Sequence, residues 1–348
     1  MYTCIDPLKV SEELGRQVKR LARMQDAVRS DTFVKLTGAL ALTGENMHAM
    51  SRIAGFNYGN GLRKLDDLSA VELERVVKAL VRDDPVLLIV DDTHDVKRYA
   101  LAEPVSGTWA QIFYVPGEGA FLPSLQLLVI AVKDLRTNQV YPVHVEIYVP
   151  RKVMDELEKR GVVVTFRTKI ELMLELVSRL REIFNVQGIV FDTWYVNGRT
   201  LLPDLVSELK SNARVAEGGE PRRVDELGPG VHHVTYRGVP IKLLVVDYKG
   251  HGRRYFFSTD TSTPEEEILT AWENRWDVEV IIREMKQLGL EEGSHRSLTR
   301  TLGFIKLVAL TLIALLLVRY SLKLSLGVKE ISTTLKRVYL GLKRRRKV

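Results

Sequence analysis

The spacing of apolar positions changes near Pro85 and divides the chain into two regions. Residues 1–82 show the three-to-four-residue repeat of amphipathic helices, in segments such as Phe33–Leu42 and Ala70–Val81. We predict a small helical N-terminal domain here, with DNA binding as its expected role. The stretch Leu42–Leu65 has a short helix, a glycine-containing break and a basic continuation, a pattern shown both by helix-turn-helix DNA readers and by ordinary small helical bundles.

After Pro85 the pattern becomes strand-like, with short runs rich in β-branched residues. Three consecutive strands, which suggest a meander, are followed by a helix, a fourth strand and a second helix. The predicted strands are Val86–Asp92, Leu125–Val132, Val143–Val149 and Gly188–Asp192, and the predicted helices are Ile170–Ile183 and Leu201–Leu209. Strands that come first and then alternate with helices indicate a mixed α/β layer fold.

A second set of strands is predicted as an insertion at about residues 214–262. Gly218–Gly230 is rich in glycine, proline and charge and is predicted to be a loop, whereas Val234–Tyr248 and Arg253–Asp260 alternate like antiparallel strands. A long helix is then expected from Pro264 to about Leu288, with acidic residues in its first turn. We place this part of the chain in one domain, 83–320, followed by a basic C-terminal tail, 321–348.

One apolar segment raises the possibility of a membrane span. Leu302–Val318 is 17 residues long and contains Lys306, whereas a bilayer requires about 20 apolar residues. A buried helix of a globular protein is the favoured interpretation, and a membrane anchor is the alternative. We therefore predict no membrane partner.

Composition narrows the class of protein further. The 348 residues carry a net charge of +7, which favours polyanionic partners such as nucleic acid or an acidic membrane surface. Cys4 is the only cysteine, which excludes a disulfide framework and predicts an intracellular protein. The seven histidines lack metal-ligand spacing, so zinc is not predicted. We also find no G-x-S-x-G elbow, which argues against acyl transfer.

Acidic residues end two of the apolar predicted strands. Asp91 and Asp92 follow the run VLLIV, and Asp192 follows GIVF. A charged side chain at such a position is costly unless it is paired, and a cation would pair with both if the two strands lie side by side. The alternative is that each Asp caps the turn that follows its strand.

Four residues of the long predicted helix share one face. Trp272, Arg275, Glu279 and Lys286 fall within an arc of roughly 60° on an ideal helix. A stripe of this chemistry is expected to face solvent or a charged partner. From that stripe, Arg275 and Lys286 are placed to bind phosphates beside the carboxylate of Glu279.

The spacing Trp272-x2-Arg275-x3-Glu279-x6-Lys286 resembles the Tyr-x2-Arg-x3-Glu-x6-Lys (YREK) signature of DDE insertion-sequence transposases. The segments Val90–Thr93 and Phe191–Tyr195 resemble the first and second catalytic Asp motifs of that family, in the same order. The resemblance covers roughly residues 85–320. It implies an RNase H-like mixed α/β sheet with flanking helices and a β-strand insertion between the second Asp and the Glu.

The resemblance also implies a site and a reaction. Asp91, Asp192 and Glu279 would hold two Mg²⁺ ions, for which Mn²⁺ can substitute, with Asp92 as the alternative to Asp91. Trp272 would stack on a displaced base or pack against the sheet, whereas Trp194 and Tyr195 are expected in the core. The reaction would be cleavage at the ends of the element followed by strand transfer into target DNA.

Partners and location follow from the same resemblance. Double-stranded DNA is the expected partner, as the terminal repeats of the element and as target, bound by a homodimer on paired ends in the cytoplasm, at the nucleoid. The basic tail would neutralise backbone phosphates. The alternatives are a catalytically inactive, transposase-derived DNA-binding protein, another RNase H-like nuclease, and a membrane protein anchored by Leu302–Val318.

Overall fold

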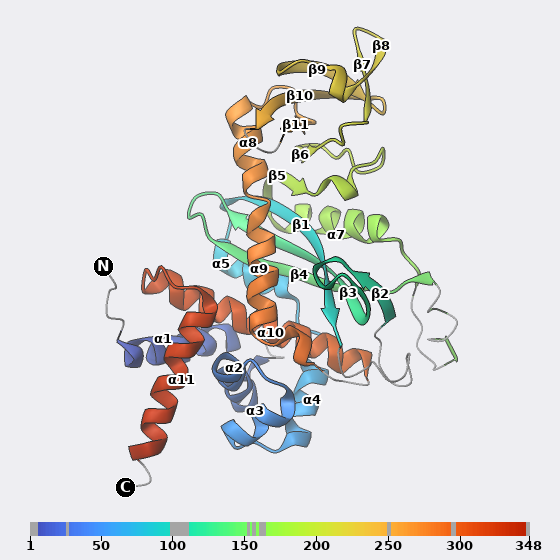
Figure 1. Ribbon diagram of the computed structural model, residues 1–348. Helices are drawn as coiled ribbons and strands as arrows, with labels where there is room; N and C mark the ends of the chain where they lie inside the picture. The colour runs from blue at the N-terminus through green and yellow to red at the C-terminus, as the bar shows by residue number, and fades with distance from the viewer. Residues whose placement is uncertain are drawn as a thin grey trace.

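Five helices form the N-terminal region, which confirms the helical pattern of the sequence (Figure 1). The computed structural model describes residues 6–25, 28–97, 111–151, 154, 158–159, 165–248, 252–293 and 297–345, so Cys4 lies outside the described residues. The helices are α1 (Pro7–Ala22), α2 (Asp31–Thr43), α3 (Met47–Ala54), α4 (Tyr58–Leu68) and α5 (Leu73–Val81). The first four begin at a polar side chain that accepts a backbone N–H: Asp6, Ser30, Asn46 and Asn57.

One large mixed sheet forms the centre of the molecule (Figure 1). Its first strands are β1 (Pro85–Val96), β2 (Gln111–Val115), β3 (Ala120–Asp134) and β4 (Val140–Tyr148), followed by α7 (Lys169–Ile183), β5 (Asn185–Phe191) and β6 (Leu205–Glu208). Strand β3 pairs antiparallel with β1, β2 and β4, whereas β5 runs parallel to β1 and β6 parallel to β5. The mixed α/β class is confirmed. The three strands predicted to form a meander pair in the order β1, β3, β4, but strand β2, which was not predicted, also pairs with β3, so they are not consecutive.

The prediction of a helix at Leu201–Leu209 is wrong, because this segment forms strand β6. Its residues pair with β5 on one side and with strand β11 (Gly252–Ser258) on the other. A short apolar run has too few residues to distinguish a period of 3.6 from a period of 2, and pairing with two neighbouring strands decides the outcome.

The predicted β insertion is present and continues the central sheet edge to edge. It contains β7 (Arg214–Glu217), β8 (Glu220–Arg223), β9 (Gly230–Tyr236), β10 (Val239–Tyr248) and β11. The β11–β6 pairing joins these strands to the rest of the sheet. The expected loop Gly218–Gly230 is only partly a loop, because β8 forms a hairpin with β7 within it.

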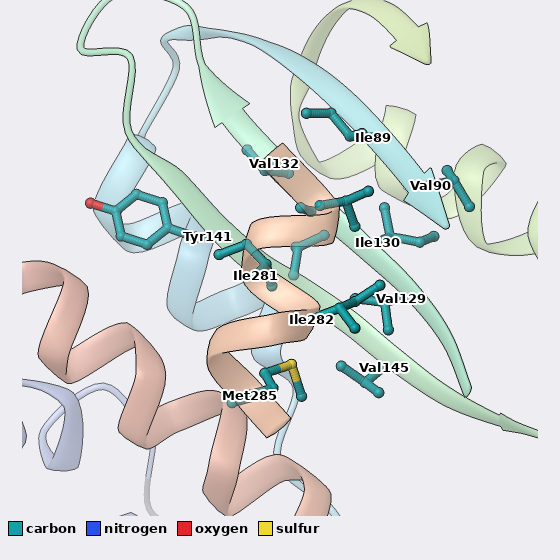
Figure 2. Close-up of a cluster of buried hydrophobic side chains, with 14 of the residues drawn as sticks. Ile89, Val90, Val129, Ile130, Val132, Tyr141, Val145, Ile281, Ile282 and Met285 are labelled. Atoms are coloured by element: carbon teal, nitrogen blue, oxygen red, sulfur yellow. The ribbon is translucent and has the colours of Figure 1, made fainter. Parts of the chain in front are cut away.

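The long helix expected from Pro264 to Leu288 is two helices, α8 (Glu265–Glu273) and α9 (Trp276–Gln287). Lys133 of β3 fixes the junction, donating hydrogen bonds to Asn274 at 2.7 Å and to Asp277 at 2.9 Å. Helix α9 then lies across the sheet (Figure 2). Its apolar residues pack on the side chains of β1, β3 and β4 in the cluster Ile89, Val90, Val129, Ile130, Val132, Tyr141, Val145, Ile281, Ile282 and Met285.

The apolar segment of the sequence forms the core of helix α10 (Leu298–Ser321), which is buried inside the protein. It contacts α1, α2, α4, α9, α11 and β4, and 89% of its most apolar window is buried. Lys306 within it donates hydrogen bonds to the carbonyl oxygens of Ser69 at 2.6 Å and Val71 at 2.7 Å. The buried-helix interpretation is confirmed, and two backbone carbonyl oxygens accept hydrogen bonds from the Lys306 ammonium.

The segment expected to be a basic tail contains helix α11 (Val328–Arg345). Val328, Ile331 and Leu335 of this helix are buried, and it packs against α1 and α2. The apolar residues interspersed among the lysines and arginines therefore anchor this part of the chain to the N-terminal helices.

The crossing of α10 and α4 predicts that Gly303 tolerates no side chain. A Cβ atom at Gly303 would lie 1.9 Å from the backbone oxygen of Leu65, so the two helices would have to separate. We expect Gly303→Ala to lower the free energy of unfolding by about 1–3 kcal/mol in urea titrations. Gly15→Ala in α1 is the matched control, since nothing lies within 4 Å of its Cβ position; it should stabilise by about 0.5–1 kcal/mol. Equal effects of the two substitutions would contradict the close crossing.

Candidate functional site

The parallel pairing of β1 with β5 places two of the predicted carboxylates at neighbouring positions. In the register of these strands Val90 lies opposite Phe191, and the next residues are Asp91 and Asp192. Parallel neighbours are about 4.8 Å apart and point to the same face of the sheet. Asp192 also caps the short helix that follows it, accepting a hydrogen bond from the Thr193 N–H at 2.8 Å. The capping interpretation is therefore confirmed for Asp192, and the pairing of its carboxylate with that of Asp91 stays a prediction.

Asp91 and Asp92 have different partners, because consecutive strand residues face opposite sides of the sheet. The Asp92 carboxylate accepts hydrogen bonds from Lys169 at 2.7 Å and from Gln126 at 3.1 Å. Asp91 accepts a bond from the Asp92 backbone N–H at 2.8 Å. Lys169 begins helix α7, so Asp92 is neutralised on the α7 side of the sheet. Asp91 is the better placed of the two to take a cation.

Burial raises the pKa of Asp91 to about 7, and the nearby charges of Asp92 and Glu279 act in the same direction. The hydrogen bond from the Asp92 backbone and the charge of Arg275 oppose the shift. A carboxyl group whose pKa is raised in this way lacks sufficient positive charge around it. Such a group is a candidate functional residue.

Glu279 approaches the same end of the sheet from α9. It lines an open hollow together with Asp91, Asp92 and Lys286. The Arg275 guanidinium binds Glu279 at 2.6 Å, and Arg275 itself is only 9% exposed. That guanidinium lies 5.1 Å from the centre of the Trp272 ring and 4.8 Å from that of the Trp276 ring. Arg275 is therefore held between two indoles and neutralises Glu279.

The break between α8 and α9 divides the predicted stripe. Trp272 is 7% exposed and packs against Phe256 of β11, with ring centres 5.5 Å apart, as the packing alternative predicted. Lys286 lines the hollow and pairs with Glu291 at 3.1 Å. The structure thus brings Glu279 and Lys286 beside Asp91 and places Trp272 in the core.

The exposed indoles of this region belong to other residues. Trp276 is 57% exposed, and Trp194 is 54% exposed, so the prediction that Trp194 packs in the core is wrong. Lys169 lies over the Trp194 ring, 4.1 Å from its centre. Tyr195, the next residue, is fully buried as predicted. The short helix Thr193–Tyr195 sends the two neighbouring aromatic rings in different directions.

Tyr195 shows that the acidic residues gather at one place. Its pKa is raised by burial first and then by the negative charges of Asp92, Asp91 and Asp192. Neither Tyr195 nor Lys169 was identified from the sequence as part of the site. Lys169 and Asp92 are 77 residues apart in the chain, and neither segment carries a motif that would signal the pair.

The donor types at the site fit Mg²⁺, which binds carboxylate oxygens in preference to other ligands. The spacing is wider than a metal requires: among the described residues no three His, Cys, Asp or Glu side chains are close enough to hold an ion. Glu279 is directed to Arg275 by their ion pair, whereas Asp91 has a raised pKa that a cation would lower. The residues match the chemistry of a magnesium site, and Glu279 would have to leave Arg275 to reach one.

Comparison with known proteins identifies the family. The family model DDE_Tnp_2, "Archaeal putative transposase ISC1217", matches residues 10–327, so the chain belongs to this family of transposases. A search of curated proteins finds no match. Among solved structures, the cryo-EM structure of the piggyBac transposase synaptic complex with hairpin DNA is similar at 14% sequence identity. That match has a TM-score of 0.45 and covers 99% of this chain and 73% of the other.

The raised pKa of Asp91 predicts a specific dependence of stability on pH. Between about pH 4 and pH 7 the unfolded chain releases a proton that the folded protein retains, so the free energy of unfolding falls as pH rises. Asp91→Asn removes this fall in the free energy of unfolding, because an amide does not titrate. In metal-free buffer we expect the variant to match the wild type near pH 4 and to exceed it at pH 8 by on the order of 2–4 kcal/mol, measured by urea unfolding.

Asp92→Asn is the matched control, because it changes the adjacent carboxylate, which has an ion-pair partner. It removes the counterion of Lys169, whose side chain is 12% exposed, and should destabilise the protein at pH 8 by about 1–3 kcal/mol. A stability difference between Asp91→Asn and wild type that is independent of pH would rule out the buried, protonated Asp91.

Proposed function

We propose that this protein is an active DDE transposase that cleaves DNA at the ends of its element and transfers the strands into target DNA. The observation that carries this proposal is that Asp91 follows a strand paired parallel with the strand before Asp192, and that Asp91 lines one hollow with Glu279 of helix α9. Membership of a transposase family supports it. We also assign the chain to the YREK branch, on the spacing of Arg275, Glu279 and Lys286.

In this proposal Asp91, Asp192 and Glu279 would hold two Mg²⁺ ions, or Mn²⁺ in their place. The metals would activate the attacking oxygen and stabilise charge on the phosphate and the leaving oxygen. The chain's own contribution is a set of carboxylates in a partly desolvated site. Asp91 is partly buried and Glu279 is carried on a helix anchored to the sheet, so neither position varies freely.

Arg275 and Lys286 have a second role in this proposal. When Glu279 turns toward the other carboxylates, the Arg275 fork becomes available to bind a phosphate in two places, still oriented by Trp272 and Trp276. Lys286 would neutralise a phosphate across the same hollow. Before DNA binds, the Arg275–Glu279 ion pair would keep Glu279 away from the other carboxylates. The substrate in this proposal is double-stranded DNA, and a homodimer of this chain binds the paired ends of the element.

Cleavage of a plasmid that carries the gene's own flanking DNA tests the proposed function. We expect the wild type to cut at the repeat ends with Mg²⁺ or Mn²⁺ and to be inactive in EDTA. Glu279→Gln should reduce cutting by a factor of at least about 10², because an amide is a poor metal ligand. Glu273→Gln, on the exposed surface of α8, should cut like the wild type.

The same assay separates the proposal from its closest competitor. An inactive, transposase-derived protein would keep Glu279 paired with Arg275, and it would bind the flanking DNA without cutting it. Binding without metal-dependent cutting would therefore reject the active enzyme and retain the DNA-binding descendant.

A further inference from the structure

A basic cavity adjoins the carboxylate site on the side of the β insertion. It has a volume of about 440 Å³, and Thr193, Val196, Lys210, Arg214, Tyr236 and Arg237 are among the residues that line it. Thr193 directly follows Asp192, and Lys210 lies between β6 and β7. Arg214 is the first residue of β7, Tyr236 is the last residue of β9, and Arg237 follows it in the turn to β10. We call this cavity the insertion groove. It spans the junction between the central sheet and the inserted strands.

The charge of the insertion groove is positive. Lys210, Arg214 and Arg237 are exposed, and no carboxylate of the described residues lies within ion-pair distance of them. Glu208 is the single acidic residue of the lining, and Arg254 neutralises it through two hydrogen bonds, one of 2.6 Å from Nη2 to Oε2. Three basic side chains therefore face one cavity, where they repel one another unless an anion enters.

Two further features favour a polymer of phosphates over a single anion. The lining also includes Val196 and Tyr236, residues with apolar surface that can contact a sugar between charged groups. Arg237 donates a hydrogen bond from Nε to the Tyr236 hydroxyl at 3.1 Å, and this bond directs the guanidinium. Basic groups interspersed with such residues match the alternation of phosphate and deoxyribose in a nucleic-acid strand.

We propose that the insertion groove binds the phosphodiester backbone of the DNA strand next to the phosphate that reacts at Asp91 and Asp192. Because consecutive Cα atoms are about 3.8 Å apart, Thr193 places the groove within a few nucleotides of the carboxylates. The proposal rests on the proposed function for the identity of the strand. It assigns Lys210, Arg214 and Arg237 as positioning residues that fix the register of DNA at the site without reading its sequence.

Duplex binding in metal-free buffer tests this proposal without requiring cleavage. The probe is a fluorescein-labelled duplex containing the gene's flanking sequence, titrated by anisotropy at several salt concentrations. Each phosphate contact contributes about 0.9 to the slope of log K against log salt. We expect Arg214→Gln/Arg237→Gln to lower that slope by about 2 relative to the wild type.

A matched control removes the same charge elsewhere. Arg136→Gln/Arg222→Gln changes two exposed arginines, at the β3–β4 turn and on β8, neither of which lines the groove, and should retain the wild-type slope. Far-UV circular dichroism verifies that both variants are folded. An unchanged slope in the groove variant, or an equal fall in both variants, overturns the proposal, as does a wild type that does not bind duplex.

The two proposals can fail separately. If the wild type cuts DNA with Mg²⁺ and the groove variant keeps the wild-type slope, the insertion groove is excluded and the transposase function stands. If the wild type binds but does not cut, and the groove variant loses slope, the groove holds DNA in a protein without the proposed reaction.

Discussion

The pairing of β1 with β5 is the constraint on which the site depends. The last residues of both strands are buried, up to Val90 and Phe191, and the next residue of each is Asp. Burying one carboxylate is costly, and burying two side by side adds their mutual repulsion. The hydrophobic contacts of the strands hold the two acids together despite this repulsion. For Asp91, burial together with the charges of Asp92 and Glu279 raises the pKa to about 7.

The positively charged side chains near Asp91 lie on the two faces of the sheet, and each is paired with another acidic residue. Lys169 neutralises Asp92 on the side of α7, whereas Arg275 is engaged with Glu279 on the side of α9. Asp91 is left without an ion pair of its own among the described contacts. Asp91 lines the same hollow as Lys286, whose ammonium is paired with Glu291.

The hydrophobic pattern of the sequence predicted the elements that have a clear local period, and it missed features that depend on contacts with residues distant in the chain. The apolar runs that became β1, β3 and β5, the helical N-terminal region and the inserted strands were all predicted, because each carries its own period or turn residues. Strand β6 was missed, since four residues contain too little periodicity. The single long helix was also wrong, because Lys133 from a distant strand fixes the break at Asn274. For the site, spacing located Glu279 and Lys286 but could not distinguish Trp272, which is buried, from Trp276, which is exposed.

The packing of helix α10 limits how this protein can exchange domains during evolution. It contacts α1, α2 and α4 on one side and α9 and β4 on another, so the N-terminal helices and the central sheet share a single interior (Figure 1). Exchange of the N-terminal helices for those of another protein would expose a long apolar surface on α10. Unlike a chain of independent modules joined by linkers, this molecule can acquire a new recognition surface only by substitutions at exposed positions, while its buried junction stays matched.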